Sequence, residues 1–213
     1  MKKMIIEPHY LPVIQYFTYL YHSDLFILDD VSLFEKQSYR NRTYISGANG
    51  KMCLTIPVVK GKTSQSFSHV KIDYSSNWQH IHWQSIISAY NNSPFFEYMQ
   101  HLYEPYFKKQ YKFLIDLNLE LIINISEQLK SANKIQLLSD LPDHTEALTD
   151  LRNHIHPKAK LHKTDPSYKE IEYIQVFSER FGYQQNLSIL DLLFSLGPEA
   201  VINLKNNLTQ KDV

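Results

Sequence analysis

The sequence predicts an α/β fold, with an N-terminal βαβ-type unit plus a β-hairpin and a mainly helical C-terminal half. Three patterns support this prediction. Two short apolar runs at 4–6 and 25–28 flank a segment with the spacing of an amphipathic helix. An Asn-Gly pair at 49–50 separates two alternating segments, which is the strongest short-range signal for a hairpin. From residue 77 onward, apolar residues recur every three or four positions, as they do in helices.

The composition is that of a globular protein. The chain has 213 residues, 43% of them hydrophobic and 21% charged, and its formal net charge is zero. A chain of this length can bury its own core, so we expect a single domain over 1–213, with a mixed α/β part at 1–76 and a mainly helical part at 77–213. The balanced charge argues against a basic nucleic-acid-binding protein.

The sequence also restricts the compartment and the kinds of site. Its single cysteine, Cys53, excludes an internal disulfide and a cysteine-based zinc site. The N-terminus lacks a signal-peptide core, and every apolar stretch is too short or too often interrupted to span a membrane. We therefore expect a cytoplasmic protein without a transmembrane segment. The sequence leaves a peripheral association with a membrane enzyme open.

The N-terminal unit determines where a ligand is expected. A strand at 4–6, a helix at 11–22 with Pro12 in its first turn, and a strand at 25–28 form a strand–helix–strand unit. The two strands of such a unit are parallel, and ligands gather at their carboxyl ends. Those ends carry Glu7 and His9 on one side, and Asp29 and Asp30 on the other.

The remaining elements follow from local patterns. Hairpin strands are expected at 43–45 and 52–56, and short strands at 70–72 and 135–138. The segment 142–166 is polar and has no clear pattern. Ser188, with Asp191 three residues later, resembles a capping box that starts a helix, and Gly197-Pro198 ends it. Helices are expected at 78–90, 95–103, 111–130 and 188–195.

Four residues at the predicted strand ends are candidates for acid–base chemistry: Glu7, His9, Asp29 and Asp30. The aspartates could also hold a divalent metal through their oxygens. The structural alternative is that they cap the next turn and pair with Arg40 or Arg42, while Glu7 forms a salt bridge with a neighbouring lysine. We assign no metal ligands, because the His80/His82 pair lies in a predicted helix, where positions i and i+2 diverge. The His154/His156 pair lies in a polar loop.

A run of basic residues suggests an anionic ligand. No aspartate or glutamate occurs between Lys36 and Lys71. Arg40 and Arg42 offer two guanidinium forks that suit phosphate or carboxylate, and on a strand they would share one face. The alternative is a solvated loop and hairpin. Nucleic acid is not expected, because no basic helix or RNP-like motif accompanies the run. The basic residues are Lys36, Arg40, Arg42, Lys51, Lys60, Lys62 and Lys71.

Several familiar catalytic motifs are absent from the sequence. It contains no Gly-x-Ser-x-Gly elbow, no Gly-x-Gly-x-x-Gly fingerprint and no Walker lysine loop. Classical serine hydrolases, kinases and dinucleotide enzymes are therefore poor fits. No cofactor can be assigned.

Several sequence blocks follow one another in a characteristic order: 5–12 with Tyr16-Phe17, 24–31, Lys36 with Arg40-Asn41-Arg42, 49–58, 89–96, and 187–194 with 197–200. Their order resembles that of the WbqC-like protein family, specifically a branch common in Bacteroidetes-like bacteria. The resemblance covers nearly the whole chain. Glu7 departs from the family's usual glutamine and Gln15 from its common glycine.

The resemblance implies a role in the biosynthesis of O-antigen or a related surface polysaccharide, with transfer of glycine or another acyl group to an amino sugar. On this hypothesis, the substrate is a phosphate-bearing sugar linked to a nucleotide or a lipid. Lys36, Arg40 and Arg42 would hold phosphate. Tyr10 and Asn41 would orient the sugar, and Glu7, His9 or Asp30 would act as a base.

Two alternatives stay open at this point. One is a nucleotidyltransferase, by loose analogy with the strand, His-Pro motif and helix of that fold. The other is a non-catalytic binding or scaffold module of a polysaccharide-assembly complex, which would present an exposed apolar patch. The sequence does not indicate the oligomeric state.

Overall fold

The computed structural model describes residues 2–61, 65–131, 134–141 and 148–208. Its central sheet has the strand order β5-β2-β1-β6, and every neighbouring pair is parallel. Ile6 lies opposite Leu28, so the predicted parallel strand–helix–strand unit is confirmed. The strands are β1 (Lys3–Ile6), β2 (Leu25–Leu28), β5 (Ile135–Leu137) and β6 (Leu148–Asp150).

The first helix begins later than its apolar spacing predicts. Helix α1 runs over Ile14–His22 and connects β1 to β2. Leu11 has a φ of 40°, in the left-handed region, which is incompatible with a helix starting there. Val13 instead forms an antiparallel bridge with Ser188. The chain between β1 and α1 is therefore a fixed turn rather than a first helical turn.

The predicted hairpin is confirmed and is longer than expected. Strands β3 (Arg42–Gly47) and β4 (Gly50–Thr55) pair antiparallel with Gly47 opposite Gly50. Gly50 has a φ of 97°, which accounts for glycine at the end of this tight turn. The segment 70–72, predicted as a strand, forms only isolated bridges to Val58 and Phe113, so no ladder develops.

Three helices follow the hairpin. Helix α4 starts three residues later than predicted, because the preceding residue, Phe113, bridges Lys71. It ends at Gln128, and Lys130 beyond it has a left-handed φ of 55°. A short 3₁₀ helix follows α3 at the predicted Glu104-Pro105 break. The helices are α2 (Trp78–Tyr90), α3 (Phe96–Tyr103) and α4 (Leu114–Gln128).

The C-terminal half adds two kinds of element that the sequence did not predict, namely β6 and two short helices. The predicted helix at 188–195 is α6, and the hydroxyl of Ser188 accepts from the backbone N–H of Leu190, 3.4 Å away. Asp191 does not complete a capping box; its carboxylate binds Tyr173 and Gln175. The helices here are α5 (Ser178–Phe181), α6 (Ile189–Leu196) and α7 (Ala200–Asn206).

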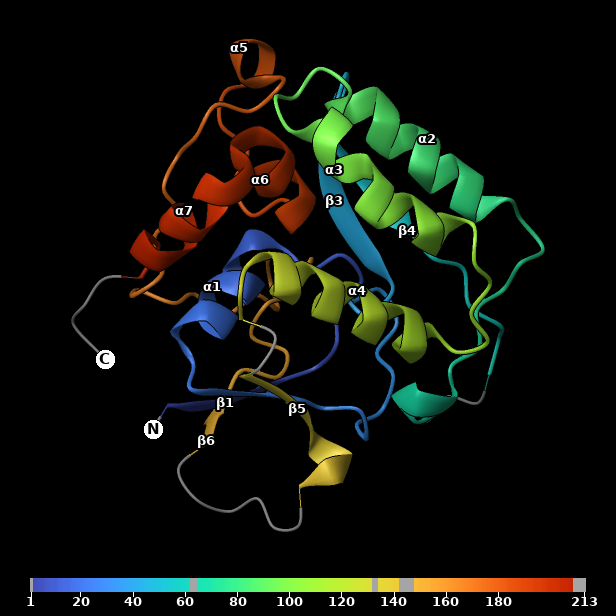
Figure 1. The fold of residues 1–213 in the computed structure, drawn as a ribbon. Coiled ribbons are helices and arrows are strands. Elements are labelled where there is room, and N and C mark those ends of the chain that lie inside the picture. The colour runs from blue at the N-terminus through green and yellow to red at the C-terminus, as the bar shows by residue number, and fades with distance from the viewer. Residues whose placement is uncertain (1, 62–64, 132–133, 142–147, 209–213) are drawn as a thin grey trace.

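The sheet is covered unequally on its two faces. Helices α1 and α4 lie over one face, where Ile6, Phe26 and Leu28 join the main apolar core (Figure 1). On the opposite face, Ile5 and Ile27 belong to a small cluster with Leu138. The main core also contains residues of the hairpin and of α2, α3, α4, α6 and α7. No helix among the described residues has the length and apolarity needed to cross a membrane.

Candidate functional site

The candidate site lies at the carboxyl edge of the parallel sheet. Glu7 follows β1, Asn153 follows β6, and Arg40 lies in the segment between β2 and β3. The side-chain amide of Asn118, on α4, joins two of these segments by donating to the carbonyl oxygens of Pro8 (3.2 Å) and Arg40 (2.8 Å). Asn118 thus holds the segment after β1 close to the segment before β3. Ligands of parallel sheets usually bind at this edge, beyond the carboxyl ends of the strands.

Glu7 and Arg40 form a buried ion pair at this point. Their side chains are 2% and 3% exposed, and Oε1 of Glu7 lies 3.3 Å from Nη1 of Arg40. The backbone N–H of Asn153 lies 3.3 and 3.2 Å from the two carboxylate oxygens of Glu7. Burial opposes ionisation, but the contact with His9 and the positive charge of Arg40 outweigh it and lower the pKa of Glu7 to about 2. Glu7 is therefore a carboxylate at neutral pH.

His9 lies beside this carboxylate. Its Nε2 is 3.5 Å from Oε1 of Glu7, a contact that does not meet the geometry of a hydrogen bond, and its ring packs against Tyr16 and Tyr39. Burial lowers the pKa of His9, and the charge of Arg40 adds to the effect, whereas Glu7 opposes it. Burial is the largest of these effects, so the imidazole of His9 is neutral at pH 7. Glu7 and His9 are thus an ionised carboxylate next to a neutral base.

Two further residues extend the cluster towards solvent. Oε2 of Glu35 lies 3.7 Å from Nη1 of Arg40, and Oε1 lies 3.5 Å from Nε2 of His156. The Asn153 amide, oriented with its NH₂ towards the carboxylates, donates to Glu35 (3.1 Å) and Glu7 (3.3 Å). The Glu35 side chain is 41% exposed, whereas that of His156 is 2% exposed. Contacts therefore link Glu7, buried in the interior, to Glu35 at the surface.

Sequence reasoning did not assign Glu35, Asn153 or Asn118 to the site. Glu35 stands directly before the basic run, and that position was the one available signal. His156 was considered only as a metal ligand paired with His154. Among the described residues, no group of three or more His, Cys, Asp or Glu side chains is arranged to hold a metal.

The two predicted aspartates lie at the same edge of the sheet but have partners within the protein. The carboxylate of the fully buried Asp29 accepts from the backbone N–H groups of Val31 (3.2 Å) and Ser32 (2.9 Å). It also pairs with Arg152 at 3.1 Å, so its arginine partner is neither Arg40 nor Arg42. Asp30 accepts from the backbone N–H of Ser139 at 3.1 Å.

The predicted substrate-binding residues separate in the structure. Tyr10 is fully buried and its hydroxyl lies 3.0 Å from Nδ1 of His82 on α2. The Asn41 amide donates to the carbonyl oxygen of Ile56 at 3.0 Å. Both side chains therefore have partners inside the protein, and neither joins the cluster around Glu7. Lys36 is exposed.

Only one of the two predicted guanidinium forks lies on a strand. Arg42 begins β3, but Arg40 precedes the strand and turns into the acidic cluster, so they do not form the shared face expected of strand neighbours. The positive charge of Arg40 is balanced within the protein by the carboxylates of Glu7 and Glu35. Lys62, another member of the basic run, lies outside the described residues.

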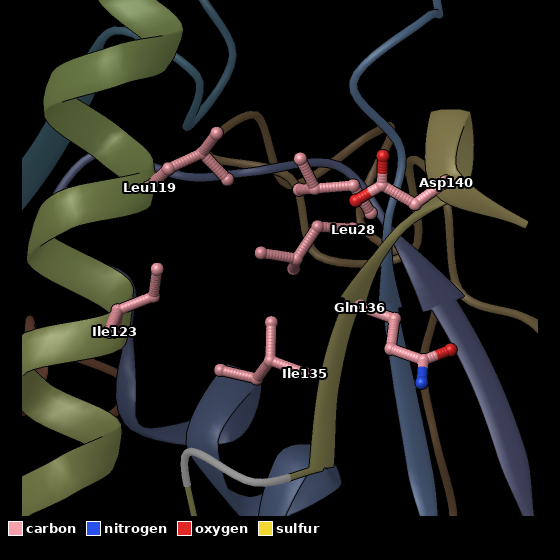
Figure 2. A pocket seen from close by; sticks show the side chains of 7 residues that line it. Leu28, Leu119, Ile123, Ile135, Gln136 and Asp140 are labelled. Atoms are coloured by element: carbon pink, nitrogen blue, oxygen red, sulfur yellow. The ribbon is translucent and has the colours of Figure 1, made fainter.

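Two cavities adjoin this edge of the sheet. One, of about 380 Å³, lies between α4 and the sheet. Figure 2 shows Leu119 and Ile123 of α4 facing Leu28 of β2 and Ile135 of β5 across it, with Asp140 at its edge. The other, of about 220 Å³, is lined by Glu35 and Lys36 together with the apolar Phe34, Val58, Val59 and Val70. The second cavity is in contact with the polar cluster through Glu35.

One comparison with known proteins identifies a family. A family model described as the WbqC-like protein family matches residues 7–165, which include every residue of the cluster. The chain is also 28% identical to the uncharacterized protein Rv1507c of Mycobacterium tuberculosis, in an alignment that covers 94% of this chain and 96% of the relative. No solved structure matches the chain.

Proposed function

The chain belongs to the WbqC-like protein family, and on that premise we propose that it is an enzyme of surface-polysaccharide biosynthesis that transfers an acyl group to an amino sugar. The observation that carries the proposal is the Glu7–His9 pair, a buried carboxylate beside a neutral imidazole at the carboxyl edge of a parallel sheet. A transferase of this kind needs a base that is unprotonated at neutral pH and can accept a proton there.

In the proposed reaction, the sugar amine attacks the carbonyl carbon of an activated acyl donor. A new C–N bond forms, the bond to the donor's leaving group breaks, and the amine's proton passes to a base in the cluster. Glu7 would orient His9 and stabilise the imidazolium that forms, in the way that a buried carboxylate assists a catalytic histidine. Arg40, which is paired with Glu7 and Glu35, would position the carboxylates rather than hold phosphate.

The residues that we propose for substrate binding differ from those expected from the sequence. Lys36 is exposed beside the smaller cavity and is the group we propose for the phosphate of a nucleotide- or lipid-linked sugar. Tyr10 and Asn41 are assigned to the protein's own hydrogen bonds. At about 220 Å³, the cavity is below the usual range of about 300–1,000 Å³ for a drug-sized ligand, so it would take one sugar end of a longer substrate.

A thermal-shift panel tests the proposal. It would compare nucleotide-diphosphate sugars, nucleoside triphosphates with and without magnesium, coenzyme A thioesters and glycine, since a ligand that binds the native state raises the melting temperature. We expect a shift with a nucleotide-linked amino sugar that weakens in Lys36→Ala, and acylated sugar, detected by mass spectrometry, that is lost in His9→Gln. The control Lys108→Ala alters an exposed lysine in an i,i+4 pair with Glu104, away from the cluster, and should change neither result.

Two outcomes would favour the alternatives. A shift seen only with a triphosphate and magnesium would replace the proposal with a nucleotidyltransferase. A panel without any shift, together with no acylated product, would favour a non-catalytic binding module.

A further inference from the structure

A third cavity, of about 620 Å³, lies where the start of α3 and the end of α4 meet helices α6 and α7 (Figure 1). None of its lining residues belongs to the cluster around Glu7 or to the cavity beside Lys36. Its volume is within the usual range of about 300–1,000 Å³ for a small-molecule site. The structure therefore contains a second hollow of ligand size, separate from the candidate site.

The walls of this cavity are mainly apolar. The apolar side chains come from the four helices and the residues next to them, and include Phe95, Tyr98, Met99, Leu129, Leu193 and Val201. The backbone N–H of Phe95 donates to the carbonyl oxygen of Phe194 at 2.9 Å, which joins the start of α3 to α6. Gly197 has a left-handed φ of 53°, and a Cβ atom at this position would lie 2.5 Å from the ring of Phe95. The glycine thus lets this ring pack directly on the backbone at the end of α6, so the wall is already formed without a ligand.

Lys130 is the one charged residue among the described residues that line this cavity. Its side chain is exposed, and it has neither an ion-pair nor an aromatic partner in the described part of the chain. Gln128, which supplies the amide of the lining, already donates to Asn124 (2.7 Å) and accepts from Tyr103 (2.9 Å). The cavity therefore combines apolar walls with a single ammonium group that the protein does not neutralise.

We propose that this cavity binds a single-chain anionic amphiphile, such as a fatty acid, with its alkyl chain against the apolar walls and its carboxylate at Lys130. Charge complementarity decides the class of ligand, because Lys130 attracts an anionic head group and repels a cationic one. The alkyl chain contributes through the apolar surface that it removes from water. A membrane surface is a different partner, since it is recognised by several clustered basic residues rather than by one lysine in a cavity.

The site is tested on the full chain with ¹³C-labelled methionine methyl groups, and dodecanoate below its micelle concentration is the probe. Met99 lines the cavity, whereas Met52 lies on β4 and is the internal reference. We expect dodecanoate to shift the Met99 resonance in a saturable manner, with one ligand per chain, and to leave the Met52 resonance unchanged. Decanoate, which is two methylenes shorter, should bind about tenfold more weakly. No saturable shift at Met99, or equal shifts at both methionines, would overturn the proposal.

The charge of the ligand is tested at constant chain length. Dodecanol has no charge and dodecylammonium has the opposite charge, so both should bind more weakly than dodecanoate. Lys130→Gln should weaken dodecanoate binding by about two- to fivefold, the range expected of an exposed ion pair, and should leave dodecanol binding unchanged. Lys130→Glu should reverse the preference in favour of dodecylammonium. Equal affinity for the three ligands in the wild type would refute the proposed role of Lys130.

A matched control separates the site from the overall charge of the protein. Lys160→Gln removes another exposed lysine, outside the cavity, and should keep the wild-type preference for dodecanoate. Because Lys130 is also exposed, its variants remove no buried contact, and an unchanged Met52 resonance verifies that they are folded. The same loss of preference in Lys160→Gln as in Lys130→Gln would contradict binding at Lys130.

Two further outcomes would give the cavity another occupant and overturn the proposal. Binding to phosphatidylglycerol vesicles that depends on Lys130, without a response to dodecanoate, would assign this face to a membrane surface. A Met99 resonance that shifts with protein concentration, and does not respond to dodecanoate, would assign it to a second copy of the chain.

Discussion

Nη1 of Arg40 lies 3.3 Å from Oε1 of Glu7, and both side chains are almost completely buried. A buried ion pair of this kind adds little net stability relative to an apolar pair, but the loss of one partner leaves an uncompensated charge in the interior. Arg40 supplies the positive charge that the buried Glu7 carboxylate requires.

We predict that replacing Arg40 destabilises the protein more than replacing Glu7. Arg40→Met should lower the free energy of unfolding by about 3–5 kcal/mol, because it leaves the buried carboxylate of Glu7 without its positively charged partner. Glu7→Gln should cost less, because Arg40 keeps Glu35 as a partner. Urea unfolding of both single variants and the double variant measures this. A double variant less stable than the sum of the single effects would contradict the assigned pairing.

Stability in acid should depend on Glu7. Its pKa is about 2 in the folded protein, against an ordinary value of 4.5, so its contribution is fully present above pH 4.5 and is lost as the pH falls towards 2. Integrated between these values, the loss relative to Glu7→Gln should reach about 2 kcal/mol by pH 3. Urea titrations of the wild type and Glu7→Gln from pH 7 to pH 3 give the difference. A difference that stays constant below pH 4.5 would show that Glu7 has an ordinary pKa in the folded protein.

Tyr10→Phe should be a stability variant. The mutation removes the hydroxyl that lies 3.0 Å from Nδ1 of His82, and it leaves a buried ring nitrogen without its partner. The expected cost is about 1–3 kcal/mol in the free energy of unfolding. Tyr98→Phe is the matched control, because Tyr98 is 72% exposed and the same change there should have an effect within about 0.5 kcal/mol. An unchanged stability for Tyr10→Phe, with weaker ligand binding, would return Tyr10 to the substrate site.

The elements that were predicted correctly have local sequence patterns. The hairpin follows from Asn49-Gly50 and its alternating flanks, and α2 has the predicted bounds, 78–90. Strand β6 has only three residues and lies in a polar segment, so its structure depends on pairing with β1 more than 140 residues earlier in the chain. No local pattern records a pairing of that kind.

Site residues that directly follow a predicted strand could be located from the sequence, whereas residues that depend on long-range pairing could not. Glu7 and His9 lie at the carboxyl edge of the sheet because they directly follow the parallel strand β1, a rule that applies to the sequence directly. Arg40 precedes β3, outside the parallel sheet, so the rule does not account for its contact with Glu7. Asn153 and His156 depend on the unpredicted β6, which carries their loop to that edge. Asn153 also has a left-handed φ of 58°, which the sequence does not reveal.

The buried carboxylate of Asp191 should affect the pH dependence of stability in the opposite direction from Glu7. It lies on α6 with no exposed surface, and its Oδ2 accepts from Tyr173 (2.6 Å) and Gln175 (3.0 Å). Burial outweighs these hydrogen bonds and raises the pKa of Asp191 from an ordinary 3.8 to about 6. Between these values the folded protein binds more protons than the unfolded chain. This group therefore stabilises the fold as the pH falls from about 6 to 4, and its ionisation costs up to about 3 kcal/mol above that range.

Asp191→Asn should remove this dependence. Relative to the wild type, the variant should lose stability as the pH falls from 7.5 to 4.5, because only the wild type gains from protonation in that interval. Asp165→Asn is the matched control: Asp165 also accepts from a tyrosine, Tyr19 at 2.6 Å, but its hydrogen bonds outweigh burial and its pKa is lowered. Its stability difference should therefore stay flat over the same interval. Urea unfolding at four pH values distinguishes the two variants, and parallel behaviour would mean that Asp191 is ionised without cost despite its burial.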